Sequence, residues 1–146
     1  MIFNYNGTLE SKRELVKLLN ATREKDGVIN TLSVARMQCF HYGHKKLLDF
    51  HEEIGDKNIL AIGSCQEERT IANPYNASQR IEMVRMVKGF DKRFSGKLSI
   101  IKLNDIGAAH PGQWKEYVLS KIENWSGNLP KINVYIGGSE LDIIDN

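Results

Sequence analysis

Four short apolar segments rich in β-branched residues recur along the chain, and segments with a helical pattern separate them. The apolar segments are residues 28–37, 58–64, 97–103 and 131–137. The helical patterns are residues 9–24, 44–54, 77–90 and 113–125. Their spacing predicts one inward face in the first, with Leu9, Leu15, Val16, Leu18 and Leu19, and a buried face in the third, with Ile81, Val84, Met86 and Val87. Because strands that alternate with helices build βαβ units, the sequence predicts an α/β fold with a parallel sheet that is covered by helices on both faces.

Length and composition indicate one globular domain. The chain has 146 residues, of which 41% are hydrophobic and 26% charged, and both shares are ordinary for such a domain. Residues 1–27 are interpreted as a helical extension in front of the first strand. No apolar run is long enough to cross a membrane, and no secretion signal is evident. Cys39 and Cys65 are too few for a disulfide framework, so reduced thiols and a cytoplasmic location are expected.

The charge pattern excludes some classes of partner. Formal net charge is +2, with basic and acidic residues interspersed. The basic cluster at residues 88–97 is interpreted as a solvated helix end and loop, because a nucleic-acid surface needs more charge and interleaved aromatic side chains. We expect neither a nucleic-acid nor a membrane partner, and the sequence leaves a homo-oligomer open.

Polar segments of unusual composition follow the predicted strands. They include His41-Tyr42-Gly43-His44 and the segments at 63–74, 104–112 and 137–142. Ligands of parallel α/β sheets bind beyond the carboxyl ends of the strands, so we expect a site at this edge. Gly43 lets the backbone approach a ligand. The start of the following helix attracts anions, and Lys45 and Lys46 add positive charge. These features favour a phosphate site.

The histidine pair has two other interpretations. One is a zinc site that recruits further ligands from Cys39, Cys65, His51 or His110, although the spacing matches no common zinc motif. The other is a pair of surface histidines without a function.

Further segments match one known family in order. They read RMQCFHYGH at 36–44, IGSCQ at 62–66, NPYNASQRI at 73–81, NDI at 104–106 followed by Trp114, and VYIGG at 134–138. Together they resemble the nucleotidyltransferases with a His-x-Gly-His signature. Within that superfamily they resemble the nicotinamide-mononucleotide (NMN) adenylyltransferases of the archaeal type and of bacterial NAD regulators. The resemblance implies a Rossmann-like nucleotidyltransferase fold.

The resemblance also implies a reaction, in which NMN and ATP give NAD and pyrophosphate with Mg²⁺ on the ATP phosphates. His41, His44 and Arg36 are the implied catalytic residues. The residues implied to bind ATP are Met37, Gln38, Phe40, Gly43, Arg80 and Gly137. The residues implied to bind NMN are Ser64, Asn73, Asn104, Asp105 and Trp114, with the tryptophan stacked on the pyridine ring. No protein ligand to a metal is implied.

Some of these residues also have purely structural interpretations. Arg36 can form a surface ion pair, Arg80 can be a solvated helix residue, and Asp105 can cap a turn. Trp114 can belong to the core, as a single tryptophan on a helix usually does.

The chain departs from the family pattern at several positions. Ala35 and Cys39 replace a glycine and a proline, and the carboxyl-terminal I-S-x-T-x-x-R element of the family is absent. Residues 5–15, with Gly7 and Thr8 ahead of a helix that bears Lys12 and Arg13, are a candidate replacement if they fold over the site.

Other functions remain open. One is a related transferase that uses CTP with an alcohol phosphate, or ATP with pantetheine phosphate. Another is a module that binds ATP or NAD without turnover, to sense them for a partner.

Overall fold

The computed structural model describes residues 2–3, 9–88, 98–107, 112–127 and 131–136. Its elements are β1 (Ile2–Phe3), α1 (Leu9–Asp26), β2 (Asn30–Ala35), α2 (Tyr42–Ile54), β3 (Lys57–Ile62), α3 (Ala77–Lys88), β4 (Leu98–Lys102), α4 (Gln113–Ser126) and β5 (Val134–Ile136). The predicted α/β alternation is confirmed, and the bounds of the predicted elements shift by a few residues. β1 was not predicted, because a strand of two residues has no recognisable sequence pattern.

The strands form one sheet in the order β1-β5-β2-β3-β4, and every neighbouring pair is parallel. From β2 onward, the chain adds strands on one side as far as β4 and then returns to place β5 on the other side of β2. The direction of winding therefore reverses between β2 and β5. In doubly wound sheets, ligands bind at such a switch point, beyond the carboxyl ends of the strands.

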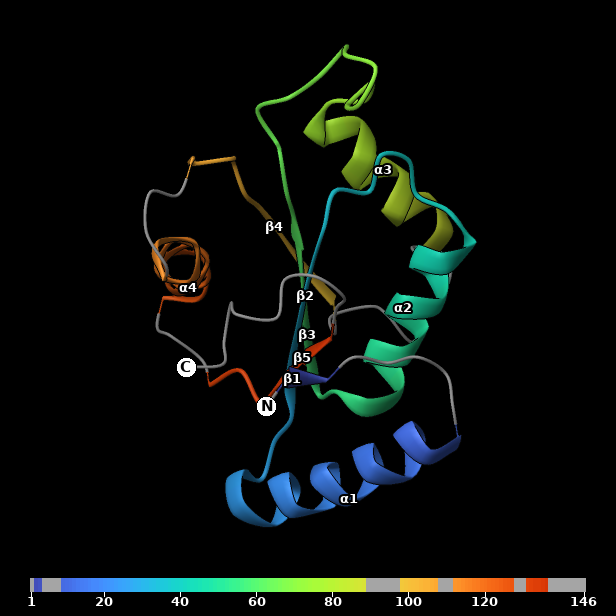
Figure 1. The fold of residues 1–146 in the computed structure, drawn as a ribbon, viewed down its shortest axis with the longest axis vertical. Coiled ribbons are helices and arrows are strands. Elements are labelled where there is room, and N and C mark those ends of the chain that lie inside the picture. The colour runs from blue at the N-terminus through green and yellow to red at the C-terminus, as the bar shows by residue number, and fades with distance from the viewer. Residues whose placement is uncertain (1, 4–8, 89–97, 108–111, 128–130, 137–146) are drawn as a thin grey trace.

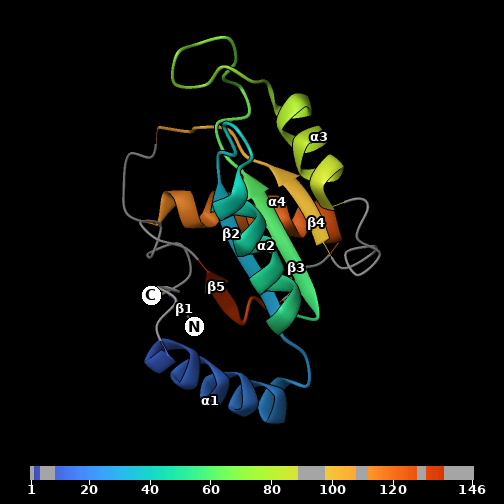
Figure 2. The ribbon, with the colours of Figure 1, turned by 90° about the vertical axis from the view of Figure 1, so that its right-hand side faces the viewer.

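Helices cover both faces of the sheet (Figures 1 and 2). α2 and α3 lie on one face and α4 lies on the other, whereas α1 crosses the end at which β2 begins. In Figure 1 the chain leaves β2, β3 and β4 at the top, and α1 lies at the bottom. The candidate replacement segment at residues 5–15 thus leads into a helix at the opposite end from the histidine pair, and residues 4–8 lie outside the described part.

The alternation of side chains along each strand builds the two main cores. Ile59 and Ala61 of β3 pack in the cluster that contains Val118 and Ile122 of α4. Leu60 and Ile62, the alternate residues, pack in a second cluster with Leu48 of α2 and Val84 of α3. β3 is thus buried on both faces, as the sequence analysis predicted for a parallel sheet.

The buried faces of two helices differ from the prediction. Leu9, Leu15, Val16, Leu18 and Leu19 were expected on one inward face of α1, yet Val16 and Leu18 are exposed while Leu15 is buried. A third cluster joins Leu15 to α2 and β5, so the contact of this helix is narrow. In α3, Met86 and Val87 are exposed instead of buried. Arg80, Val84 and Lys88 form the buried stripe, at a spacing of four residues.

A buried polar group ties α2 to β2. His51 is fully buried, and its Nδ1 and Nε2 lie 2.5 Å from the hydroxyls of Thr31 and Ser33 respectively. Burial lowers the pKa of His51 to about 3, so the ring is neutral near pH 7. The hydroxyl of Ser33 donates to the carbonyl of Ile136 in β5, so towards Nε2 of His51 it is the acceptor. Directional bonds therefore fix α2 on the sheet where apolar packing alone would let it slide.

Candidate functional site

The two histidines form the cap at the start of α2. His41 is the N-cap residue, and its Nδ1 accepts a hydrogen bond of 3.1 Å from the backbone N–H of Gly43. In return, Nδ1 of His44 accepts a hydrogen bond of 3.2 Å from the backbone N–H of His41. Ser or Thr with Glu or Gln usually makes this reciprocal cap. With Nδ1 accepting, the proton of each neutral ring is on Nε2, which is then a donor.

The same two rings lie against each other. Their centroids are 3.8 Å apart, and the ring of Phe40 stacks at 5.8 Å from that of His44. Burial and the nearby His41 lower the pKa of His44, while a hydrogen bond with the backbone of Cys39 acts in the opposite direction. A positive charge on His41 makes a second one on His44 unfavourable, and both this repulsion and burial disfavour the charged form of His44.

Cations surround the start of this helix. Lys45 pairs with Asp49 one turn further on, at 3.0 Å. Lys46 lies over the ring of Tyr42, at 5.4 Å from its centroid. Arg36 is exposed in the connection between β2 and α2. These charges and the helix dipole make this end of α2 attractive to phosphate.

The connection from β2 to α2 uses some predicted ATP ligands for structure. The side chain of Met37 is buried in the core cluster beneath the loop, and its φ of 56° lies in the left-handed region. The amide of Gln38 donates to the carbonyl of Tyr75 at 2.8 Å and accepts from the N–H of Tyr75 at 2.9 Å. Through Gln38, the loop is thus held against the segment that precedes α3.

The exits of β3 and β4 are joined by a carboxylate. Ser64 is buried and donates from Oγ to Asp105 at 3.0 Å. Gln66 donates from Nε2 to the other oxygen of Asp105 at 3.1 Å and accepts from its N–H at 3.0 Å. Two predicted NMN ligands, Ser64 and Asp105, are thus in contact.

The other predicted NMN ligands lie on the same exits. The N–H of Asn104 donates to the hydroxyl of Tyr117 at 2.8 Å, and the ring of Tyr117 is tilted against that of Trp114 at 5.5 Å. Trp114 is half-buried against the core of α4, and its Nε1 is a buried donor with no partner among the described residues. Asn73 is buried as well, and within the same residues its Oδ1 is an acceptor without a partner. Unpaired buried groups of this kind need an explanation, and a ligand is one.

Arg80 has no exposed surface, so it is not a solvated helix residue. Its Nη1 donates to the carbonyls of Arg36 and Gly63 at 2.8 and 2.7 Å, and its Nη2 donates to the carbonyl of Ser64 at 2.9 Å. The guanidinium is therefore occupied by backbone in this structure. Its predicted contact with ATP would require the surrounding groups to move, because the side chain is fully buried.

Some predicted residues of this edge lie outside the described part of the chain, and two contacting residues were not predicted. Gly137, His110 and residues 89–97 of the basic cluster lie outside the described residues. The sequence analysis assigned no role to Gln66 or Tyr117. The only signal for Gln66 was its place in the IGSCQ segment, and Tyr117 stands one helical turn after Trp114.

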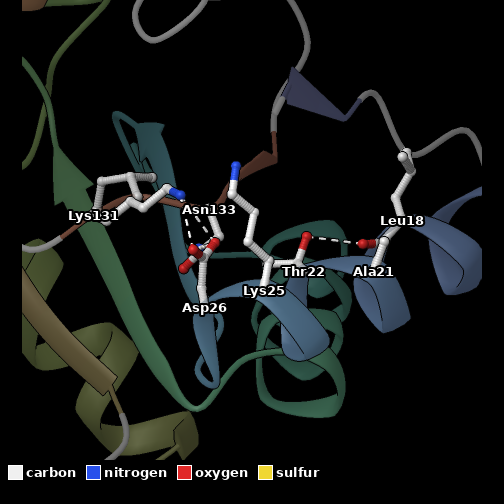
Figure 3. A pocket seen from close by; sticks show the side chains of 8 residues that line it. Leu18, Ala21, Thr22, Lys25, Asp26, Lys131 and Asn133 are labelled. Atoms are coloured by element: carbon white, nitrogen blue, oxygen red, sulfur yellow. Dashed lines mark hydrogen bonds and ion pairs between the residues drawn. The ribbon is translucent and has the colours of Figure 1, made fainter.

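A pocket of about 330 Å³ lies at the opposite end of the sheet and contains none of the predicted residues (Figure 3). It lies between the end of α1 and the residues before β5. Its polar groups satisfy one another: Asp26 accepts from Lys131 and Asn133, and Thr22 donates to the carbonyl of Leu18. Because these polar groups are already hydrogen-bonded to one another, the pocket is a poor site for a polar ligand. Chemistry therefore points to the strand exits.

Among the described residues, no three His, Cys, Asp or Glu side chains are placed to hold a metal ion. His110, one of the candidate zinc ligands, lies outside them. Cys39 and Cys65 are both free. In the same part of the chain, no helix is long and apolar enough to span a membrane.

Comparison with known proteins decides the family. The model of the cytidylyltransferase-like family matches residues 33–121, which include the exits of β2, β3 and β4. The chain belongs to the cytidylyltransferase-like family. Proteins of this family are nucleotidyltransferases with the His-x-Gly-His signature, so the resemblance seen in the sequence is confirmed at this level.

The curated relatives of this cytidylyltransferase-like chain include archaeal enzymes. Nicotinamide-nucleotide adenylyltransferase of Pyrococcus horikoshii is 35% identical over 117 residues, which are 78% of this chain and 56% of that protein. The Methanococcus vannielii enzyme of the same name is 38% identical over 73 residues, 50% of this chain and 41% of that protein. The chain thus spans about half the length of these relatives.

A solved structure supports the fold. A bifunctional NMN adenylyltransferase/ADP-ribose pyrophosphatase from Francisella tularensis, complexed with AMP and a manganese ion, superposes with a TM-score of 0.63. The match has 22% sequence identity and covers 75% of this chain and 31% of that one. This likeness confirms the predicted Rossmann-like arrangement.

Proposed function

We propose that this protein transfers the adenylyl group of ATP to NMN, which forms NAD and pyrophosphate. The histidine cap at the start of α2 carries the proposal: two stacked rings, each with an Nε2 donor, stand at a helix start beside the switch point of the sheet. The names of the archaeal relatives support this choice of substrates within the family.

The reaction needs no nucleophile from the protein. An oxygen of the 5′-phosphate of NMN forms a bond to the α-phosphorus of ATP, and the bond from that phosphorus to the oxygen bridging to the β-phosphate breaks. Pyrophosphate leaves in line with the attacking oxygen. The protein contributes by bringing two anionic groups together and by offsetting the charge that moves to the leaving group.

His41, His44 and Arg36 take the catalytic roles in this proposal. The Nε2 donors of the histidines bind phosphate oxygens, while Nδ1 of each ring keeps its hydrogen bond in the cap. Arg36 is exposed beside them and orients the α-phosphate or the phosphate of NMN. Gly43 allows close approach of the phosphates, because it is exposed and has no side chain.

The remaining ATP contacts come from the same loop. Phe40 is half-buried beside His44 and offers an apolar surface. Because the side chains of Met37 and Gln38 are engaged in the fold, they contribute through their backbone. Gly137 follows β5 in sequence and stays a predicted ATP contact outside the described residues.

NMN lies at the exits of β3 and β4 in this proposal. Asp105, or Asn104 beside it, accepts from the carboxamide, and Ser64 holds Asp105 in place. The unpartnered Oδ1 of Asn73 is a second acceptor for the nucleotide. Trp114 stacks on the pyridine ring, although its half-buried position also fits a core residue.

Mg²⁺ enters with ATP as part of the substrate and bridges its phosphates, and it usually keeps several waters and needs few protein ligands. The proposal keeps the expected cytoplasmic location and small-molecule partners ATP, NMN and NAD, and it leaves self-association open.

A substrate panel tests the choice of nucleotides. Pyrophosphate release is measured with Mg²⁺ and three pairs: ATP with NMN, CTP with an alcohol phosphate, and ATP with pantetheine phosphate. We expect release only with ATP and NMN. Release with either of the other pairs alone would assign the chain to a different transferase of the family.

A further inference from the structure

Arg80 is a buried residue whose guanidinium binds several backbone carbonyls at the candidate site. It lies in the first turn of α3, and its guanidinium donates to the carbonyls of Arg36, Gly63 and Ser64. Its Nε lies 3.3 Å from the carbonyl of Asn76, where α3 begins. A single side chain thus connects the start of one helix to two strand exits.

These bonds begin where the strand ladder ends. Ala35 and Ile62 are the last paired residues of β2 and β3, and the N–H of Gly63 still donates to the carbonyl of Ala35 at 3.0 Å. One residue further on, Nη1 of Arg80 binds the carbonyls of Arg36 and Gly63 together. The guanidinium therefore replaces the direct contact between the two strands at the point where they separate.

Both chains turn sharply just beyond this point. Met37 and Ser64 each stand two residues after the paired ends, with φ values of 56° and 51°. Residues other than glycine rarely adopt this conformation, and it persists only where the surroundings enforce it. Arg80 binds the carbonyl of Arg36, which directly precedes Met37, and it binds the carbonyl of Ser64 itself. These bonds therefore help to hold Met37 and Ser64 in their left-handed conformations.

Ser64 extends the connection to a third exit. Its carbonyl accepts from Arg80, while its hydroxyl donates to Asp105 after β4. On the other side, Arg36 is the first residue of the loop that ends in the histidine cap. Displacement of the guanidinium would therefore move groups at both halves of the site.

We infer that Arg80 is a positioning residue for adenylyl transfer: its guanidinium sets the spacing between the histidine loop and the exits of β3 and β4. The inference rests on the proposed function, and it replaces a direct contact of Arg80 with ATP. Arginine suits the role because its planar fork supplies five donors in fixed directions, whereas lysine offers one nitrogen. Within the described residues, no carboxylate lies within 4.0 Å of the guanidinium, so carbonyl dipoles hold its charge.

Two variants of Arg80 and a matched control test the inference. Arg80→Lys keeps the charge but removes the fork, and Arg80→Ala leaves a space that guanidinium ion can enter. Arg85→Lys and Arg85→Ala make the same changes at an exposed position of α3. The readouts are the unfolding midpoint, kcat and KM for ATP and NMN below that midpoint, and amide exchange at Gly63 and Cys65.

For folded Arg80→Lys we expect kcat to fall by about 10²-fold with both KM values within about threefold, because small misplacements of reacting groups cost rate more than binding. Millimolar guanidinium should restore about tenfold of the kcat lost in Arg80→Ala, and the Arg85 variants should match the unmodified chain. An unchanged kcat in folded Arg80→Lys would overturn the inference, as would loss of the fold in both Arg80 variants.

Amide exchange separates this inference from the proposed function. If the unmodified chain releases no pyrophosphate, the proposed reaction fails, and Arg80→Lys should still speed exchange at Gly63 and Cys65, whose N–H groups bond to Ala35 and Leu103. Exchange at both sites equal to that in Arg85→Lys would show that Arg80 does not hold the exits.

Discussion

The imidazole rings of His41 and His44 lie 3.8 Å apart between centroids while Nδ1 of His44 accepts from the backbone N–H of His41. At the start of α2, Nδ1 of each histidine therefore accepts a hydrogen bond of the cap, and Nε2 of each ring stays a donor. This arrangement explains why a helix start carries histidines where serine and glutamate would cap it as well. A phosphate ligand can accept hydrogen bonds from these Nε2 donors.

Removal of the second ring should abolish turnover and leave the fold. For His44→Ala we expect kcat to fall by about 10²–10³-fold or more, the usual cost of one donor to a developing charge. Loss of the cap bond should lower the free energy of unfolding by about 1 kcal/mol. Glu53→Ala, at an exposed position of the same helix, is the control and should match the unmodified chain in steady-state assays. If His44→Ala turns over nearly as fast as the unmodified chain, His44 is not a catalytic residue.

His51 should make the protein less stable in mild acid. Its folded pKa of about 3 lies below the unfolded value of 6.5, so the unfolded chain binds the proton first as the pH falls. The contribution of His51 to the free energy of unfolding is complete above pH 6.5. Between pH 6.5 and about pH 3, it should fall by about 1.4 kcal/mol for each pH unit. Denaturant titrations between pH 7 and pH 4 measure this slope. The lowered pKa of His44 adds to it in the same direction.

The variant His51→Gln isolates this effect, because carboxylates also titrate in the lower part of the range. The slope of the unfolding free energy against pH should be flatter in His51→Gln than in the unmodified chain. Equal slopes in the two proteins would mean that the buried ring does not titrate as its surroundings indicate.

Asp105 should set the affinity for NMN and not for ATP. Asp105→Asn replaces one acceptor oxygen by a donor, which would face either Ser64 or Gln66. A hydrogen bond to a charged group contributes about 1.5–3 kcal/mol, so we expect KM for NMN to rise by about tenfold or more while KM for ATP stays unchanged. Glu116→Gln in the first turn of α4 is the matched control. If only the unfolding midpoint falls and both KM values hold, Asp105 is a structural residue.

Trp114 should report on the pyridine ring by fluorescence. The variant Trp125→Phe removes the exposed tryptophan and leaves Trp114 as the only tryptophan. NMN should quench its emission, because an aromatic ring stacked on indole offers a direct route for quenching. The reciprocal variant Trp114→Phe should show no response to NMN. Quenching that persists in Trp114→Phe would place the nicotinamide elsewhere.

The sheet could be read from the sequence because its strands are buried on both faces and each is bounded by turn residues. Ile59 to Ile62 of β3 shows this, since every side chain faces one of two cores. β1 could not be read, because its two residues pair only through contacts with distant β5. The outward positions of Val16 and Met86 were also missed, because periodicity shows that a helix has an apolar stripe and not how much of it finds a partner.

The sequence also indicated where a candidate site should be sought, since the strand exits meet at one edge of any parallel sheet. Roles within the site were harder to assign. From the sequence, Arg80 can be interpreted as a solvated helix residue or as a phosphate ligand. Only the structure shows that the two strand exits enclose it. Gln38 likewise reads as a ligand until its amide is seen on the backbone of Tyr75. Contacts between distant loops leave no local pattern in a sequence.

The most direct test of the account is pyrophosphate release by the unmodified chain with ATP, Mg²⁺ and NMN, together with chromatography for NAD. We predict that pyrophosphate and NAD form in equal amounts and that neither forms when ATP or NMN is omitted. ATP or NAD that binds in calorimetry without any release of pyrophosphate would contradict the proposed reaction and indicate a nucleotide-binding module.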